Sequence, residues 1–369
     1  MRVLIADDSL LFRRSLNLVL EALPGVEVVG QATSGQQALE KIRELLPDLV
    51  TLDLEMPRMG GLEVLEILRN EAHRPAVLVV SSLSVEGGHQ TVLALQNGAF
   101  DFITKPVASR AEDSLKQLKA DLGPKIRVLN HRLGVRSLLR GGSPSEESPA
   151  GERTPVAPVK APASAQPQAP GVPRNLKPSF VMIGISTGGP GALTSLLSSW
   201  GPPLGVPVFI VQHMPPLFTR SLAENLSRQS GLDVREAEHG EVAVPNRFYL
   251  AAGGRHLKLV PVRGGIKLEL NDEPAEHNCR PSVDHLFRSA AEGFSGWPVA
   301  VLMTGMGSDG TAGLRQLRQA GCHSLAQDEA TSVVWGMPGA AARAGLIDKV
   351  LPLERLSESI RSLVLGGEA

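Results

Sequence analysis

Residues 180–193 read F-V-M-I-G-I-S-T-G-G-P-G-A-L, an apolar run followed by a serine, a glycine-rich bend and the start of a helical pattern. A short apolar run that ends in such a bend and continues into a helix is typical of a buried strand in an α/β domain. The bend leaves the hydroxyl of Ser186 at the end of that strand.

The same alternation of apolar runs and helical patterns continues through the C-terminal half of the chain. Further strands are expected at 208–212, 248–252 and 299–304, and helices at 190–199, 217–229, 282–293 and 310–320. Residues 258–270 form a hairpin pattern around Gly264-Gly265. The pattern predicts a doubly wound α/β catalytic domain with a β-hairpin, over residues 179–369.

The N-terminal block, residues 1–122, contains five strand patterns separated by helical periodicity. The apolar runs lie at 3–6, 26–30, 49–53, 76–81 and 101–104. Five such units predict a flavodoxin-like domain, with a five-stranded parallel sheet covered on both faces.

Residues 123–178 are expected to link the two domains. The stretch 125–140 is basic and weakly amphipathic, and it is a continuation of the preceding helix, a solvated linker helix or an interface with the second domain. Residues 141–178 hold nine of the 28 prolines and few large apolar groups, so they cannot bury enough surface to offset their ordering entropy. We therefore expect an extended linker there.

Composition excludes several classes of protein. The 369 residues carry a net charge of −1, which gives no general attraction to nucleic acid or anionic membranes. Cys279 and Cys322 are too few for a disulfide framework, and no apolar run approaches the roughly 18 residues of a membrane span. We expect a monomeric protein in the cytoplasm, without nucleic-acid binding or membrane insertion.

Polar residues end the predicted strands of the first block, where chemistry collects in an open parallel sheet. They are Asp7, Asp8, Asp53, Ser81 and Lys105. Three crowded carboxylates repel one another unless a cation lies among them, and Mg²⁺ suits this ligand set. Lys105 and Ser81 would then contact a phosphate on Asp53. The alternative is that the aspartates merely cap helices.

With D-D at 7–8, L-D-L-E-M-P at 52–57, Ser81 and K-P at 105–106, this block resembles the receiver domain of bacterial response regulators. The resemblance implies phosphorylation of Asp53 by a histidine kinase and switch roles for Ser81 and Phe102. It also implies Mg²⁺ held by the carboxylates and the Glu55 carbonyl. Phe102 replaces the tyrosine common at its position. A phosphate adds a charge of about −1.5 to −2, enough to repack the nearby face.

In the second block, G-I-S-T-G matches the G-x-S-x-G elbow of a nucleophilic serine. A serine needs an oriented base, and the expected strands at 208–212 and 299–304 lead to His213 and Asp309. Parallel strands would bring Ser186, His213 and Asp309 to one edge. The glycine-flanked N–H of Met306 could face a developing oxyanion.

Other readings of these residues stay open. The glycines could cradle a phosphate, but a dinucleotide fingerprint needs glycine at Ser186 and a P-loop needs lysine at Pro190. Ser186 and Asp309 could simply cap helices, and His213 could be a loop residue. The order Ser, His, Asp differs from that of α/β-hydrolases, so the elbow alone does not indicate that family.

Four strings show that the second block resembles the catalytic domain of CheB-type chemotaxis methylesterases. They are G-I-S-T-G-G-P (184–190), Q-H-M-P-P-L-F-T (212–219), R-P-S-V-D-H-L-F (280–287) and T-G-M-G-S-D-G (304–310). The resemblance implies a triad of Ser186, His213 and Asp309, with Thr187 helping to position His213. It implies no cofactor in this domain. A-A-G-G-R-H-L at 251–257 departs from the family, which usually has proline third.

The combined prediction is a phosphorylation-activated hydrolase. Its substrates would be glutamate methyl esters on the cytoplasmic domains of chemoreceptors, with methanol as product and glutamine deamidation as a second activity. A DNA-binding response regulator is the leading rival, but residues 180–369 carry 16 Lys and Arg against 18 Asp and Glu, which is no basic footprint. A second rival is a binding module with the hydrolase fold but no turnover.

Overall fold

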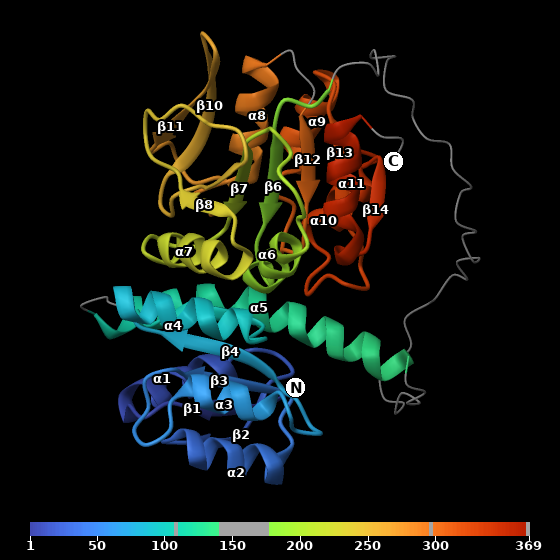
Figure 1. Ribbon diagram of the computed structural model, residues 1–369. Coiled ribbons are helices and arrows are strands. Elements are labelled where there is room, and N and C mark those ends of the chain that lie inside the picture. The colour runs from blue at the N-terminus through green and yellow to red at the C-terminus, as the bar shows by residue number, and fades with distance from the viewer. Residues whose placement is uncertain (107–109, 140–176, 295–297, 367–369) are drawn as a thin grey trace.

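A computed structural model describes residues 1–106, 110–139, 177–294 and 298–366. Figure 1 shows two α/β units stacked on each other, with helices α4 and α5 of the N-terminal unit between the two sheets. The predicted fold class is confirmed for both units. Across these described ranges, every helix is too short or too polar to cross a lipid bilayer.

The N-terminal unit alternates strands and helices throughout. Its elements are β1 (Arg2–Ala6), α1 (Leu10–Glu21), β2 (Glu27–Ala32), α2 (Gly35–Leu45), β3 (Leu49–Asp53), α3 (Gly61–Leu68), β4 (Ala76–Ser81), α4 (Val85–Gln96), β5 (Asp101–Thr104) and α5 (Ala111–Leu139).

The sheet of this unit is parallel, in the order β2-β1-β3-β4-β5. Its central strand β3 is buried along its whole length, which explains why the sequence there reads as a continuous apolar run rather than an alternating one. The strand order brings the carboxyl ends of β1, β3, β4 and β5 to one edge.

The C-terminal unit has more elements and one interruption by a hairpin. Its elements are β6 (Val181–Ile185), α6 (Gly189–Ser198), β7 (Val208–Gln212), α7 (Phe218–Ser230), β8 (Asp233–Glu236), β9 (Arg247–Leu250), β10 (His256–Val262), β11 (Gly265–Asn271), α8 (Val283–Gly293), β12 (Val299–Leu302), α9 (Thr311–Gln319), β13 (His323–Gln327), α10 (Met337–Arg343), β14 (Lys349–Leu351) and α11 (Leu353–Leu365).

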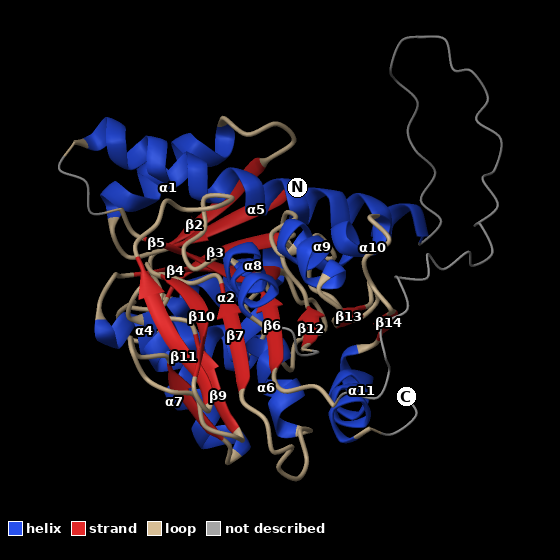
Figure 2. Cartoon of the chain, turned by 90° about the horizontal axis from the view of Figure 1, so that it is seen from above, coloured by secondary structure: helices blue, strands red, loops and turns tan. Residues whose placement is uncertain are grey.

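Seven parallel strands form the main sheet, in the order β14-β13-β12-β6-β7-β9-β8. Figure 2 shows helices on both faces, with α8 and α9 on one side and α6 and α11 on the other. The chain leaves β6 toward β7 and later returns to the opposite side as β12. That reversal makes the carboxyl ends of β6 and β12 the switch point where ligands bind in such sheets.

The last helix of the N-terminal unit extends beyond the expected domain boundary. Helix α5 continues past the expected boundary at residue 122 to Leu139, because Ile126 and Leu129 are buried in the core of that unit. The helical interpretation of 125–140 therefore holds for the residues up to 139. The expected proline-rich linker at 141–178 lies outside the described residues, apart from 177 and 178.

The two units share a continuous buried surface. Helix α4 packs on α6 and α7, and one apolar cluster contains Leu95 and Phe102 from the first unit with Phe218 and Leu222 from the second. The face of the N-terminal unit that carries its predicted switch residues is thus the face that meets the C-terminal unit.

Candidate active site

Ser186, His213 and the loop that carries Asp309 follow three neighbouring strands of the large sheet, β6, β7 and β12. Backbone hydrogen bonds fix the first two loops against their neighbours. The N–H of Ser186 donates to the carbonyl of Thr304 at 2.9 Å, and that of His213 donates to the carbonyl of Ile185 at 3.2 Å. The structure brings these three residues to one edge of the large sheet, as the sequence predicts.

The turn after Ser186 requires glycine for two different reasons. Gly188 has a φ of +78°, a conformation that costs side-chain-bearing residues energy. Gly189 has ordinary backbone angles, but a Cβ there would overlap the amide of Gln212. The same Gln212 donates to the Ser186 carbonyl at 3.0 Å, so the tight packing holds the serine loop against β7.

His213 and Asp309 form a direct pair, with Nε2 of the imidazole 2.7 Å from Oδ2 of the carboxylate. The two side chains are 10% and 2% exposed. Burial by itself would lower the pKa of His213, but hydrogen bonds to Asp309 and Cys279 outweigh it and raise the pKa to about 9. The carboxylate therefore stabilises a charged imidazole, which a general base needs after it takes a proton.

The charge on Asp309 is fixed by the N-terminus of α8. Its two oxygens accept five hydrogen bonds, from His213, the Ser282 hydroxyl and three backbone N–H groups, those of Val283, Asp284 and Gly310. Burial would raise the pKa of Asp309, but the bonds from His213 and the helix N–H groups lower it to about 2. Asp309 thus stays ionised under all ordinary conditions.

Within the described residues, no hydrogen bond links the Ser186 hydroxyl to His213. Catalytic hydrogen bonds are often long in proteins without substrate and tighten in the complex. Because Asp309 occupies Nε2, a proton from Ser186 would go to Nδ1, in competition with the contact between His213 and Cys279. Both residues line one cavity of about 750 Å³.

Met306 and Thr187 lie in the same cavity with different surroundings. In the described part of the chain, no hydrogen bond occupies the N–H of Met306, which agrees with a donor kept for an oxyanion. Thr187 was expected to support His213, but its hydroxyl donates instead to Asp101 of the N-terminal unit, at 2.7 Å. A charged carboxylate is the stronger acceptor, and it reaches Thr187 because the two units are packed together.

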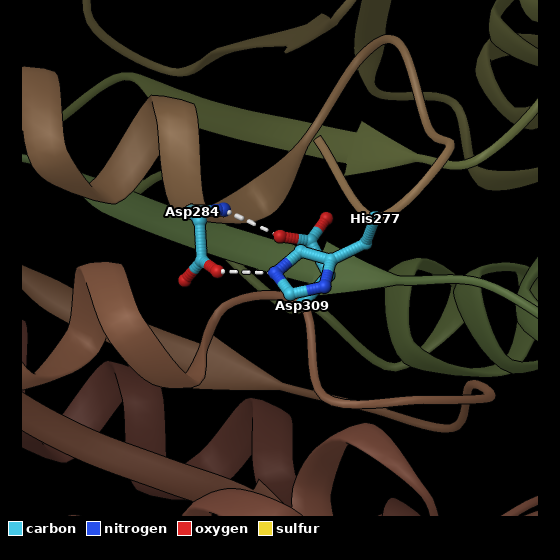
Figure 3. Close-up of side chains that lie close together, drawn as sticks. All are labelled: His277, Asp284 and Asp309. Carbon is cyan, nitrogen blue, oxygen red and sulfur yellow. Dashed lines mark hydrogen bonds and ion pairs between the residues drawn. The ribbon is translucent and has the colours of Figure 1, made fainter. Parts of the chain in front are cut away.

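A second imidazole–carboxylate pair, which sequence reasoning missed, lies beside the first (Figure 3). Nε2 of His277 is 3.0 Å from Oδ2 of Asp284, and ligand atoms of these two residues and Asp309 lie within 4.8 Å of one another. Such a set resembles a metal site in composition. The oxygens of Asp309 already accept five hydrogen bonds, however, so we assign no metal there.

In the N-terminal unit, the predicted acidic pocket has formed. Ligand atoms of Asp7, Asp8 and Asp53 lie within 4.8 Å of one another. Lys105 places its ammonium 2.6 Å from Asp53 and 3.1 Å from Asp7. Burial, followed by the nearby charge of Asp53, raises the pKa of Asp7 to about 6. Three carboxylates with one ammonium leave this pocket an excess of negative charge, which fits a hard dication such as Mg²⁺.

Of the two predicted switch residues of this unit, Ser81 contacts α4 within the unit and Phe102 contacts the other unit. The hydroxyl of Ser81 donates to backbone carbonyls near the start of α4 and accepts from Thr91 at 2.6 Å. Phe102 stacks on Phe218 of α7, with ring centroids 4.9 Å apart. The unphosphorylated pocket is thus connected to the catalytic unit through β5 and α4.

Two further contacts at this interface were not foreseen. Asp101, which contacts Thr187 beside Ser186, also pairs with Lys125 at 2.5 Å. Gln96 at the end of α4 bonds to Thr194 and Asn225, both at 2.9 Å. Neither residue belongs to a motif, so only the docked structure identifies them.

Comparison with known proteins finds a matching family for each of the two units. Residues 3–117 match the family model of the response regulator receiver domain, and residues 181–360 that of the CheB methylesterase. The catalytic-domain crystal structure of Thermotoga maritima CheB methylesterase is 39% identical, and the match covers 51% of this chain and 100% of that one with a TM-score of 0.49.

Curated relatives match along the whole chain. A protein-glutamate methylesterase/protein-glutamine glutaminase of Desulfotalea psychrophila is 42% identical over 98% of this chain and 97% of its own length. A protein of the same name from Nocardioides sp. is 43% identical over 97% of this chain and 94% of its own. The chain therefore belongs to the family of CheB-type protein-glutamate methylesterases/protein-glutamine glutaminases, hydrolases that carry a response regulator receiver domain before the catalytic domain.

Proposed function

We propose that this protein hydrolyses methyl esters of glutamate side chains on methyl-accepting chemoreceptors, releases methanol, and does so faster when Asp53 is phosphorylated. The observation that carries the proposal is the His213–Asp309 pair at 2.7 Å, in one cavity with Ser186. The names of the relatives supply the substrate class. In the cell, such a reaction gives sensory adaptation.

The proposed reaction has two steps, each with a proton transfer through His213. Ser186 Oγ attacks the ester carbonyl carbon while His213 Nδ1 takes the hydroxyl proton, and the methoxide leaves as methanol with that proton. Water then attacks the acyl-enzyme, and the same imidazole accepts its proton and returns one to Ser186 as the glutamate leaves. The N–H of Met306 stabilises the oxyanion in both steps.

The same acyl-enzyme accounts for deamidation of receptor glutamines. An amide would lose ammonia instead of methanol, and His213 would protonate that leaving group. The relatives are named glutaminases as well as methylesterases, which supports this second activity.

We propose that the docked receiver holds this site closed. Asp101 and Lys125 line the cavity of Ser186, and Asp101 occupies the hydroxyl of Thr187 next to it. Phosphorylation would draw Ser81 toward Asp53, where Lys105 already lies, and would change the position of Phe102, which weakens its stack on Phe218. The cavity would then open to a receptor segment.

The proposed partners follow from these two sites. A histidine kinase supplies the phosphoryl group, and receptor cytoplasmic domains supply the substrate, so we place the reaction in the cytoplasm and treat the enzyme as a monomer. Asp7, Asp8, Asp53 and the Glu55 carbonyl would hold Mg²⁺, which supplies positive charge to the phosphoryl oxygens.

The test is methanol release from methylated receptor, with and without a small-molecule phosphodonor. We expect Ser186→Ala to abolish release while it leaves phosphorylation of Asp53 intact, and Asp53→Asn to keep the basal rate but lose stimulation. Release by Ser186→Ala at the normal rate would end the triad assignment. Stimulation of Asp53→Asn would end the switch assignment.

A further inference from the structure

The β10–β11 hairpin of the catalytic domain lies outside the proposed triad. Its first residue, His256, is fully buried and lies against the start of α8 rather than against the cavity. Leu259 on the same strand ties the hairpin to α8 a second time, through a 3.1 Å hydrogen bond to the hydroxyl of Ser289.

The hydrogen-bond partners of His256 define its tautomer. Nδ1 lies 3.2 Å from the backbone N–H of Ser282, which can only donate. Nε2 lies 3.1 Å from the carbonyl of Pro274, which can only accept. Both bonds exist together only when Nδ1 is unprotonated and Nε2 carries hydrogen. A doubly protonated ring has no acceptor for Ser282.

Ser282 is the link between this imidazole and the triad. It is the N-cap of α8, and its hydroxyl donates to Asp309 at 2.9 Å. The next two N–H groups, of Val283 and Asp284, donate to the same carboxylate at 2.7 and 2.9 Å. Movement of Ser282 therefore moves three of the five donors that orient Asp309.

A second imidazole stacks on His256. The ring of His285 stacks on it with centroids 4.5 Å apart and planes 13° apart. His285 is buried, and its Nδ1 has no hydrogen-bond partner in the described part of the chain. Burial is the main cause that lowers the pKa of His256; His285 and Arg280 lower it further, whereas the Pro274 carbonyl and Glu276 oppose the shift. The titratable and charged groups around it are His285, Glu273, Glu276 and Arg280.

We propose that His256, in its neutral form with hydrogen on Nε2, is a positioning residue for hydrolysis, because it holds Ser282 and thereby the N-terminal turn of α8 that orients Asp309. Its effect on rate rests on the triad proposed above. Protonation of Nδ1 breaks the bond to Ser282, so the hairpin makes the orientation of Asp309 sensitive to acid.

Two substitutions separate the two bonds of the ring. Asparagine places an oxygen where Nδ1 lies and can still accept from Ser282, but it cannot take up a proton. Glutamine reaches toward Pro274 and leaves the Ser282 N–H without an acceptor. We expect His256→Gln to lower kcat about 10- to 100-fold with little change in KM, the range for a buried donor left unpaired. The kcat of His256→Asn should be at least tenfold higher than that of His256→Gln. Below pH 6.5 it should decline less than the kcat of the wild type.

The matched control is His239→Gln. His239 also contacts the hairpin, at the Leu270 N–H and carbonyl, but it is exposed and has no bond to α8. Its kcat should stay within twofold of the wild type. The kcat of a His256→Gln/Ser282→Ala double variant should fall by less than the product of the two single-variant fold-losses, since both substitutions act through Ser282.

Nitrogen NMR of the wild-type imidazoles tests the tautomer without any substitution. We expect His256 at pH 7.5 to carry hydrogen on Nε2 only. Hydrogen on Nδ1, or a folded His256→Gln protein with unchanged kcat, overturns the proposal. If the tautomer is as expected but Ser186→Ala still hydrolyses ester, the proposed triad fails and not the His256–Ser282 bond.

Discussion

The two sites of this protein each contain a carboxylate at the end of a parallel strand or in the loop that follows it, and the two carboxylates are equally buried. Asp53 and Asp309 are both 2% exposed. Asp53 is accompanied by two more carboxylates and one ammonium, that of Lys105. Asp309 is surrounded by backbone N–H groups, a hydroxyl and one imidazole.

This difference separates a site that changes its charge from one that keeps it. In the receiver domain the carboxylates repel one another, and the pKa of Asp7 is raised to about 6. A bound cation or a phosphoryl group can therefore change the charge of this site. In the catalytic domain, fixed dipoles hold Asp309 ionised, with a pKa of about 2. A switch needs the first arrangement, and a preorganised catalyst needs the second.

The largest effect is expected when the fixed charge is removed. Asp309→Asn should lower the rate of methanol release from phosphorylated protein by about 10⁴-fold, because the neutral amide no longer stabilises the imidazolium of His213. Phosphorylation of Asp53 in the same variant should remain normal and serves as the control for folding. A loss below tenfold would show that Asp309 is only a helix cap.

The next prediction concerns how stability depends on pH, and His213 and Asp309 act in opposite directions. His213 has a raised pKa, so its pairing stabilises the fold fully below pH 6.5 and is lost as pH rises through about 9. Asp309 has a lowered pKa, so its contribution is present above pH 3.8 and is lost as pH falls through about 2.

Because a base must be unprotonated, the basal rate of unphosphorylated protein should rise roughly tenfold per unit from pH 7 toward pH 9. Methanol release across that range checks this, with Ser186→Ala as the blank for alkaline ester hydrolysis. A rate that does not change with pH between pH 7 and pH 9 would contradict the raised pKa of His213.

A smaller effect is expected from removing one charge of the receiver pocket. The raised pKa of Asp7 means that ionised Asp7 opposes folding, a penalty that grows as pH rises from 3.8 through 6. Asp7→Asn should therefore raise the free energy of unfolding at pH 7.5 by about 2 kcal/mol without Mg²⁺, as measured by urea denaturation.

Added Mg²⁺ should stabilise the wild type but not Asp7→Asn. Asp8→Asn is the control for the metal-free comparison only, since Asp8 is exposed but is also a proposed Mg²⁺ ligand. If Asp7→Asn destabilised the metal-free protein, the ion pair with Lys105 would outweigh the repulsion, and the contrast between the two sites would be weaker than we infer.

The smallest effect is expected at the interface. Gln96→Ala removes hydrogen bonds to Thr194 and Asn225, and each contributes about 0.5–1.5 kcal/mol. Basal methanol release should rise roughly three- to tenfold, while the phosphorylated rate changes little. Gln36→Ala on α2, away from the interface, is the control. An unchanged basal rate would mean that docking does not limit access to Ser186.

Much of the candidate site was predictable because strand ends are visible in a sequence. Ser186 follows a buried run, and Asp53 ends another, so the topology of a parallel sheet brings each to a carboxyl edge. The residues that support them were not predictable. Ser282 and His256 are far from Asp309 in the chain, and their bonds depend on where α8 and the hairpin pack.

The amino-acid sequence by itself determined the two α/β units, the acidic pocket and the three groups at the strand ends, because hydrophobic periodicity and glycine turns are local properties. Only the tertiary structure decided which imidazole nitrogen faces Asp309, that α8 fixes its charge, that α5 runs on to Leu139, and that Asp101 contacts Thr187. These contacts join residues distant in the chain, and their geometry follows from packing, which no local pattern encodes.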